Sequence, residues 1–383
     1  MAATATHLRF PLFDSLRAIA ALCVLGAHVS FVSLAETQSA AGPFLAQLTV
    51  GVCVFFLISG FLLYRPYFAA RYYGEAGPRA WDYARRRVLR IVPAYWVALT
   101  VLAVGPGLVG LYSGDWWAFY AFAQIYRDET GLQGMSQAWS LCVEVTFYMA
   151  LPVYALVLER ASRAGDRRRL VRAELAGLAL MVVACTAVRV YAHEVDNKVL
   201  FLTLPANLDW FALGMGLAVL SVVAGERGDW PAPVRFVASR PGLCWLAAAG
   251  TFVAATVVLD LPDGLYPEFT LVQRLLQHLL FGAIATLLLL PAVFGDREGG
   301  LPRRILAWPV LAWVGTISYG VFLYNLAVAD ELKERGVDEW VPDGRLLWLG
   351  LATLAVTLLL AAVSYYVVER PLLRRKPYRR GAS

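Results

Sequence analysis

The sequence predicts an all-α, polytopic membrane protein with ten transmembrane helices and both termini in the cytoplasm. The chain of 383 residues is 59% hydrophobic and only 16% charged, whereas soluble domains carry about 25% charged residues. Its mean hydropathy is +0.59. Apolar runs long enough to cross about 30 Å of hydrocarbon lie near residues 13–34, 44–64, 87–105, 139–158, 173–192, 199–223, 242–259, 270–293, 305–327 and 346–368.

The basic residues predict the orientation of these spans. In a soluble protein, a formal charge of +6 would suggest a nucleic-acid partner. Here the arginines gather between apolar runs, so we expect a lipid bilayer and no nucleic acid as the partner. With the N-terminus inside, the outer segments hold only five of the 34 Lys and Arg residues, namely Arg127, Lys198, Lys333, Arg335 and Arg345.

The aromatic stretch from Trp116 to Tyr126 is too short to span a bilayer. If it crossed, the basic runs at 163–172 and 374–380 would lie outside, against the positive-inside rule. Residues 106–138 are therefore predicted to form one outer segment. No water-soluble domain interrupts the apolar pattern, so we expect residues 1–383 to form a single transmembrane domain.

The first span contains two ionisable residues, Arg17 and His28. Eleven helical residues complete about three turns, so both side chains share one face and lie about 16 Å apart along the axis. An ionisable residue inside a span is costly and usually faces a protein interior or a wet cavity. The pair therefore predicts a cavity that runs from a cationic inner end to an imidazole deeper in the bundle.

Arg87 and Arg90 form an RxxR pair at the start of the third span. Guanidinium groups hold phosphate oxygens through paired hydrogen bonds, so one interpretation is a phosphate clamp. Ordinary positive-inside charge is the alternative. Pro93 is expected to kink or break the helix just beyond the pair.

Glu144 lies within the fourth span. A carboxylate within a membrane span is energetically costly, so its presence needs an explanation, and two explanations remain open. It is either the partner of an arginine on another helix or the group that orients His28, as a carboxylate orients a catalytic imidazole. Asp14 is the other carboxylate that could tune His28, and we include it among candidate substrate-binding residues.

Two further polar groups lie in the sixth and eighth spans. Asp209 follows Asn207 and precedes Trp210, while Arg274 and His278 are four residues apart on one helical face. These residues are candidates for binding a polyhydroxylated acceptor. Hydrogen bonding between helices, or contact with the outer loops, explains them equally well.

The five cysteines all fall in apolar segments, and none lies in a CxxC pair or beside a histidine. Neither a disulfide framework nor a metal site is predicted. No P-loop, GxSxG or HExxH motif is present either. We expect no permanently bound cofactor.

Several motifs in this order resemble the bacterial membrane acyltransferase-3 family, which O-acylates sugars using acyl-CoA. The resemblance covers most of the chain and rests on FDSLRAIAAL with the following His28, VFFLISGFLL, RRRVLRIVPAYW, WSLCVEVTFY, FALGMGLA, GTISYGVFLYN and YYVVERPLLR. It implies a multi-pass enzyme of the bacterial cytoplasmic membrane. Some relatives carry an extracytoplasmic hydrolase-like domain, and we expect this chain to be a form without one.

The resemblance also implies roles for individual residues. His28 would be the catalytic histidine, Arg17 would support it or the acyl donor, and Arg87 and Arg90 would act on the cytoplasmic side. Many relatives have a histidine where this chain has Asn325. A mechanism that needs a second imidazole there is therefore not expected for this chain, although Asn325 can still form hydrogen bonds.

The expected reaction moves an acetyl or other short acyl group from acyl-CoA, with acetyl-CoA preferred, to a sugar hydroxyl. The acceptor would be a cell-envelope glycan, a glycolipid or a glycosylated metabolite such as a macrolide. His28 would act as a general base, with an acyl-histidine intermediate as the competing mechanism. A transporter or flippase of a glycolipid or polar solute, or a regulatory membrane protein, are the alternative functions.

Overall fold

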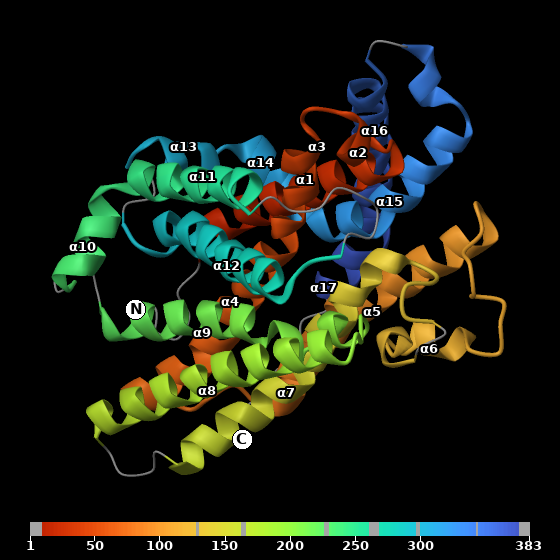
Figure 1. Ribbon diagram of the computed structural model, residues 1–383. Coiled ribbons are helices and arrows are strands. Elements are labelled where there is room, and N and C mark those ends of the chain that lie inside the picture. The colour runs from red at the N-terminus through yellow and green to blue at the C-terminus, as the bar shows by residue number, and fades with distance from the viewer. Residues whose placement is uncertain are drawn as a thin grey trace.

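The computed structural model describes residues 10–127, 130–161, 166–225, 230–259, 268–295, 299–341 and 344–374, and these ranges contain helices and turns without a strand. Eight helical segments are long and apolar enough to cross a membrane. Two bent helix pairs raise that number to ten if each pair forms one span. The predicted all-α, multi-pass fold is therefore confirmed (Figure 1).

Each apolar run contains a helix or a bent helix pair, although α4 ends at Tyr73 instead of residue 64 and α9 begins at Leu208 instead of residue 199. The long helices are α1 (Leu12–Val32), α4 (Val50–Tyr73), α5 (Ala80–Val104), α7 (Trp139–Ala161), α8 (Arg167–Glu194), α9 (Leu208–Val223), α12 (Leu271–Val293) and α16 (Arg345–Ser364). The bent pairs are α10 (Ala232–Ser239) with α11 (Pro241–Val257) at 83°, and α14 (Pro309–Thr316) with α15 (Ser318–Glu334) at 72°. Short helices are α2 (Ala35–Gln38), α3 (Gly42–Ala46), α6 (Trp116–Tyr120), α13 (Leu301–Leu306) and α17 (Arg370–Arg374).

Two local expectations need correction. The run at 305–327 is not one straight span, because the chain bends between α14 and α15. Pro93 does not break the third span, since α5 continues through it as one helix. By contrast, the stretch from Trp116 to Tyr126 contains the five-residue α6 and a three-residue 3-10 helix, Gln124–Tyr126, which agrees with its being too short to cross.

Helix α1 lies inside the bundle, where it packs against α4, α14, α15 and α16 (Figure 1). Leu16 and Ala20 on α1 have no exposed surface. The contact with α14 depends on Gly315, because a Cβ atom there would lie 1.7 Å from the carbonyl oxygen of Asp14. A glycine at this point lets the two backbones touch, which fixes the end of α1 that carries Arg17.

Helices α4 and α9 cross through a pair of glycines. A Cβ atom on Gly60 would lie 2.3 Å from the carbonyl oxygen of Phe211, and one on Gly214 would lie 2.1 Å from that of Leu57. Small residues allow this approach in the absence of a strong hydrophobic force between helices in lipid. Gly60 thus serves close helix packing, and the crossing fixes the α4 segment that includes Ser59.

Candidate active site

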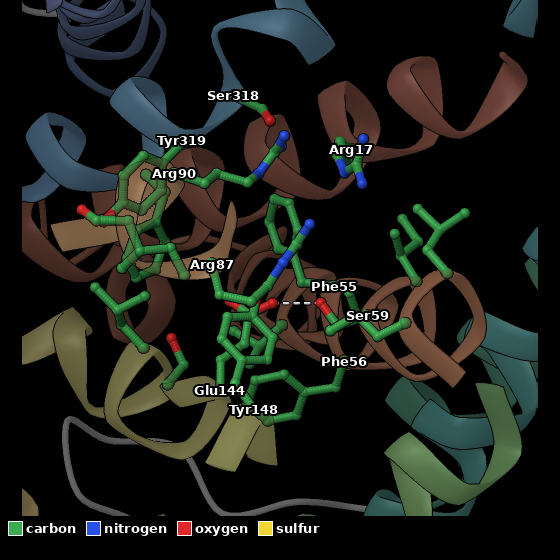
Figure 2. A pocket seen from close by; sticks show the side chains of 18 residues that line it. Arg17, Phe55, Phe56, Ser59, Arg87, Arg90, Glu144, Tyr148, Ser318 and Tyr319 are labelled. Carbon is green, nitrogen blue, oxygen red and sulfur yellow. Dashed lines mark hydrogen bonds between the residues drawn. The ribbon is translucent and has the colours of Figure 1, made fainter. Parts of the chain in front are cut away.

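A cavity of about 190 Å³ lies between α1, α4, α5, α7 and α15. We call it the arginine cavity, because Arg17, Arg87 and Arg90 line it together with Glu144, Tyr148 and Tyr319 (Figure 2). The three arginines come from two helices that are far apart in the sequence. The fold thus unites the cationic residue of the first span with the RxxR pair of the third.

The arginine cavity carries an excess of positive charge. Arg17 Nη1 donates to Asp14 Oδ1 at 2.7 Å. Arg87 lies over the ring of Tyr148, at 5.8 Å from its centroid, and its buried Nε has no hydrogen-bond partner. Within the described residues, neither Arg87 nor Arg90 forms a salt bridge. Guanidinium groups left without carboxylate partners are suited to a ligand with phosphate oxygens.

Glu144 is part of this cavity and does not contact His28 within the described structure. Its carboxylate accepts a hydrogen bond from Ser59 on α4 (Figure 2). The expectation that Glu144 orients the imidazole therefore has no supporting contact. Glu144 instead places one negative charge in a cavity lined by three arginines.

His28 has a different partner, Asn325 on α15, which is fully buried. The Asn325 amide nitrogen donates to the carbonyl oxygens of Val321 at 2.8 Å and Phe322 at 3.0 Å. Both amide hydrogens are thereby used, so the amide oxygen faces Nδ1 of His28 and can only accept. His28 Nδ1 must therefore donate, which leaves the lone pair of the neutral imidazole on Nε2.

The His28–Asn325 pair lies one helical turn from the arginine cavity. Phe322 lines that cavity and precedes Asn325 by three positions on α15. Helix α1 is continuous from Leu12 to Val32, so the rise from Arg17 to His28 is about 16 Å, as predicted. The structure thus places a cationic cavity and an oriented imidazole along the same helix.

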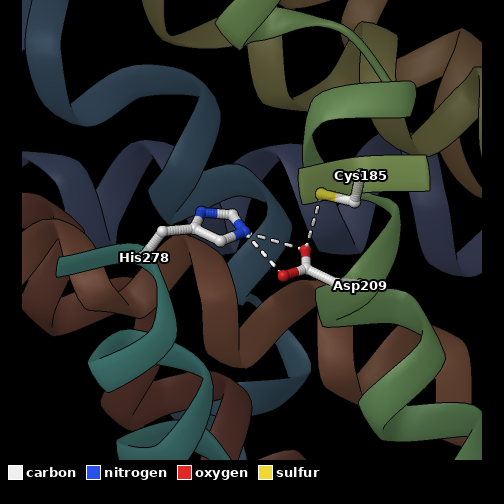
Figure 3. Close-up of side chains that lie close together, drawn as sticks. All are labelled: Cys185, Asp209 and His278. Carbon is white, nitrogen blue, oxygen red and sulfur yellow. Dashed lines mark hydrogen bonds and ion pairs between the residues drawn. The ribbon is translucent and has the colours of Figure 1, made fainter. Parts of the chain in front are cut away.

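The polar residues of the sixth and eighth spans form a separate cluster (Figure 3). His278 Nε2 lies 2.8 Å from both carboxylate oxygens of Asp209, and Cys185 Sγ donates to Asp209 Oδ1 at 3.2 Å. The His278 ring stacks on Trp210 at 4.1 Å between centroids. None of these residues lines the arginine cavity.

Cys185, Asp209 and His278 offer one ligand atom each, and these atoms lie within 4.8 Å of one another. A thiolate, a carboxylate and an imidazole are ligands that zinc accepts. No sequence motif indicates this set, because the three residues come from the separate helices α8, α9 and α12. In the structure, however, the three side chains already hydrogen-bond with one another.

Arg274 also lies away from the arginine cavity. Its guanidinium stacks on the rings of Phe201 at 4.4 Å and Phe269 at 5.2 Å. The neighbouring amides are used as well, since Gln273 caps α12 with Thr270 and Gln277 donates to Gln47 at 3.0 Å. Arg274 and His278, the predicted acceptor-binding residues of the eighth span, thus both make contacts within the protein, while the buried Nε of Arg274 has no hydrogen-bond partner among the described residues.

Sequence reasoning did not single out two aromatic residues of the arginine cavity, Tyr148 and Tyr319. Tyr319 donates to the carbonyl oxygen of Ile91 at 3.0 Å and so links α15 to α5. Both tyrosines lie in motifs of the family resemblance, WSLCVEVTFY and GTISYGVFLYN. Those motifs are the sequence feature that could have identified the two tyrosines, although they do not indicate which residue faces the cavity.

A comparison with protein families finds that the acyltransferase-3 model, described as an acyltransferase domain, matches residues 11–367. The peptidoglycan O-acetyltransferase OatA of Listeria monocytogenes is 23% identical over 94% of this chain and 55% of its own length. YrhL of Bacillus subtilis, provisionally named a peptidoglycan O-acetyltransferase, is 24% identical over 96% of this chain and 56% of its own. A provisionally named O-acetyltransferase of Staphylococcus aureus is 23% identical over 94% of this chain and 57% of its own length.

This chain therefore spans a little over half the length of these relatives. No solved structure matches it significantly.

Proposed function

Because this chain belongs to the acyltransferase-3 family, we propose that it transfers an acyl group from acyl-CoA to a hydroxyl of a sugar-containing acceptor. The observation that carries the proposal is the His28–Asn325 hydrogen bond. It leaves Nε2 of a neutral imidazole as a base, one helical turn from the arginine cavity.

The arginine cavity is the proposed site of the donor's phosphate groups. Arg87 and Arg90 lack carboxylate partners within the described residues, and Arg17 shares only one hydrogen bond with Asp14. Phosphate oxygens would accept the free N–H groups. The pantetheine arm of acyl-CoA would then extend towards His28, over a rise of about 16 Å. The arginine end of the bundle is thus proposed to face the cytoplasm, where acyl-CoA is available.

In the proposed reaction, His28 Nε2 takes the proton of the acceptor hydroxyl while the oxygen attacks the thioester carbonyl. The C–S bond then breaks, and the imidazolium donates this proton to the CoA thiolate. Asn325 is proposed to hold the tautomer through the Nδ1 hydrogen bond, so it is a positioning residue. No free charge remains on the protein at the end of the cycle.

Glu144 is proposed to position the cationic wall of the cavity rather than the imidazole. It pairs with Ser59 and lies in the same cavity as Arg87 and Arg90. A single carboxylate there limits the repulsion among three guanidinium groups while leaving a net positive charge. Asp14 is likewise proposed to reduce the repulsion that Arg17 exerts on the other guanidinium groups, since it forms an ion pair with Arg17.

The names of the relatives favour acetyl as the acyl group and a cell-envelope glycan as the acceptor. Both are proposals for this chain, which covers only part of those proteins. The proposed location is the bacterial cytoplasmic membrane, with the donor on the cytoplasmic side.

The experiment is acetyl transfer from radiolabelled acetyl-CoA in proteoliposomes that contain the protein and cell-wall glycan fragments. His28→Ala is expected to lower the turnover number at least about a hundredfold, the usual contribution of a general base. His193→Gln, on a histidine outside the arginine cavity, should leave turnover unchanged. Full turnover by His28→Ala would refute the assignment.

A further inference from the structure

A second cavity, of about 250 Å³, lies between α15 and the segment that connects α5 to α7. We call it the loop cavity, because residues 106–109 and 134–137 line it together with Leu326, Ala327, Asp330, Glu331 and Glu334. It shares no residue with the arginine cavity. Binding of the acyl donor in the arginine cavity therefore does not account for the loop cavity.

The two cavities lie on either side of the His28–Asn325 pair. Along α15, Phe322 lines the arginine cavity, Leu326 lines the loop cavity, and Asn325 lies between them. At the other wall, Gln137 lines the loop cavity and Ser140 lines the arginine cavity. Both walls therefore separate the cavities by about one helical turn, or about 5 Å.

The walls are also joined to each other at this level. Gln137 Nε2 donates to the carbonyl oxygen of Leu323 at 3.1 Å, two residues before Asn325. A ligand in the loop cavity would therefore lie next to the turn that holds the imidazole. A donor in the arginine cavity would approach the same turn from the other side.

The loop cavity is acidic where the other cavity is basic. Asp330, Glu331 and Glu334 line it, and no lysine or arginine does. Glu331 is paired with Arg335 at 2.6 Å, whereas Asp330 and Glu334 form no salt bridge within the described residues. Lys333 on the same helix donates to the carbonyl oxygen of Val32 and does not line the cavity.

Gln137 supplies a second, independent sign of a ligand. Its side chain is only 5% exposed. Its amide nitrogen is satisfied by Leu323, but its Oε1 has no hydrogen-bond partner among the described residues. An amide oxygen on a cavity wall can accept a hydrogen bond from a hydroxyl or ammonium group of a ligand. The side chains that line the cavity thus offer mainly acceptor atoms, besides the hydroxyl of Ser136.

We propose that the loop cavity binds the acceptor, and that it selects neutral or amine-bearing sugars over anionic ones. The inference rests on the proposed function. Hydroxyl and ammonium groups donate to Gln137 Oε1 and to the carboxylates of Asp330 and Glu334. A uronic acid or phosphorylated sugar would instead place its negative charge beside these carboxylates, in a cavity that no lysine or arginine lines. Donor and acceptor would thus meet at His28 from opposite sides.

Binding is tested without catalysis by labelling an introduced cysteine. Ala327→Cys places a thiol on the cavity wall, and Glu339→Cys places one on an exposed residue outside the cavity. Both variants are treated with a water-soluble maleimide in the presence of methyl glucoside, methyl glucosaminide or methyl glucuronide. We expect the first two glycosides to slow labelling of Ala327→Cys several-fold, and the glucuronide to have no effect. Labelling of Glu339→Cys should not change.

Equal labelling rates with and without every glycoside would overturn the proposal, even if the protein proves to be an active acyltransferase. Protection of Ala327→Cys by the glycosides, in a protein that shows no transferase activity, would support the sugar site and refute the proposed acyl transfer.

The carboxylates are tested by steady-state kinetics with acetyl-CoA and methyl glucosaminide. Asp330→Asn and Glu334→Gln are expected to raise the KM for the glucosaminide about tenfold each, as the loss of a charged hydrogen bond does. The KM for acetyl-CoA should not change, since the donor binds elsewhere. Glu339→Gln is the matched control. An unchanged KM for the sugar in both cavity variants would contradict the assignment.

Discussion

Asn325 accepts a hydrogen bond from Nδ1 of His28, and it cannot do otherwise. Its amide nitrogen is held by the carbonyl oxygens of Val321 and Phe322, so only its oxygen is free to face the imidazole. The partner of His28 is therefore a neutral amide rather than a carboxylate. The tautomer is fixed by the backbone of α15, through a side chain that is fully buried.

Asn325→Leu removes this acceptor while keeping a branched side chain with the same number of heavy atoms. We expect the turnover number to fall about tenfold to a hundredfold, because the imidazole loses the partner that orients it. The KM for acyl-CoA should stay the same, since the arginine cavity is intact. Steady-state kinetics in proteoliposomes measure both quantities.

Asn325→Asp is the matched control, because a carboxylate also accepts a hydrogen bond from Nδ1 of His28. It is expected to retain more turnover than Asn325→Leu. Equal losses in the two variants would indicate that Asn325 serves only packing.

Arg87→Ala and Arg90→Ala are expected to raise the KM for acyl-CoA about tenfold each, because each removes charged hydrogen bonds to the donor phosphates. The matched control is Arg86→Ala on the same helix, since Arg86 is exposed and does not line the cavity. Kinetics with acyl-CoA at varied salt concentration provide the measurement. A similar rise in the KM of the Arg86 variant would point to general surface charge instead.

Gly214→Ala is expected to destabilise the protein by about 1–3 kcal/mol, the usual cost of an atom forced into a packed contact. The added Cβ would lie 2.1 Å from the carbonyl oxygen of Leu57, so α4 and α9 would have to separate. Gly250→Ala is the control, since a Cβ there meets nothing within 4 Å. Thermal unfolding in detergent should show a lower Tm for the first variant alone.

Asp209→Asn tests whether the cluster in Figure 3 binds substrate or supports the fold. The carboxylate interacts with both His278 and Cys185, and its loss leaves buried groups without a charged partner. We expect a lower Tm, together with an unchanged KM for acyl-CoA and for the sugar. A raised sugar KM at unchanged Tm would instead support the substrate-binding role predicted from the sequence.

The sequence alone determined the membrane class, nearly all the spans and the family. These conclusions need only local information, because hydropathy is a property of contiguous residues and basic residues mark the loop ends. Arg17 and His28 were also placed correctly relative to each other. Their separation is fixed by one uninterrupted helix, α1, whose geometry is the same in any surroundings.

Tertiary structure decided which side chains meet, since that depends on how helices distant in the sequence pack. It gave His28 the partner Asn325, which is 297 residues away, and it gave Glu144 the partner Ser59. It also joined Asp209 to His278 and Cys185 on two other helices. Hydropathy does not encode the rotation of one helix against another. That rotation follows from contacts such as Gly214 against Leu57, which exist only in the assembled bundle.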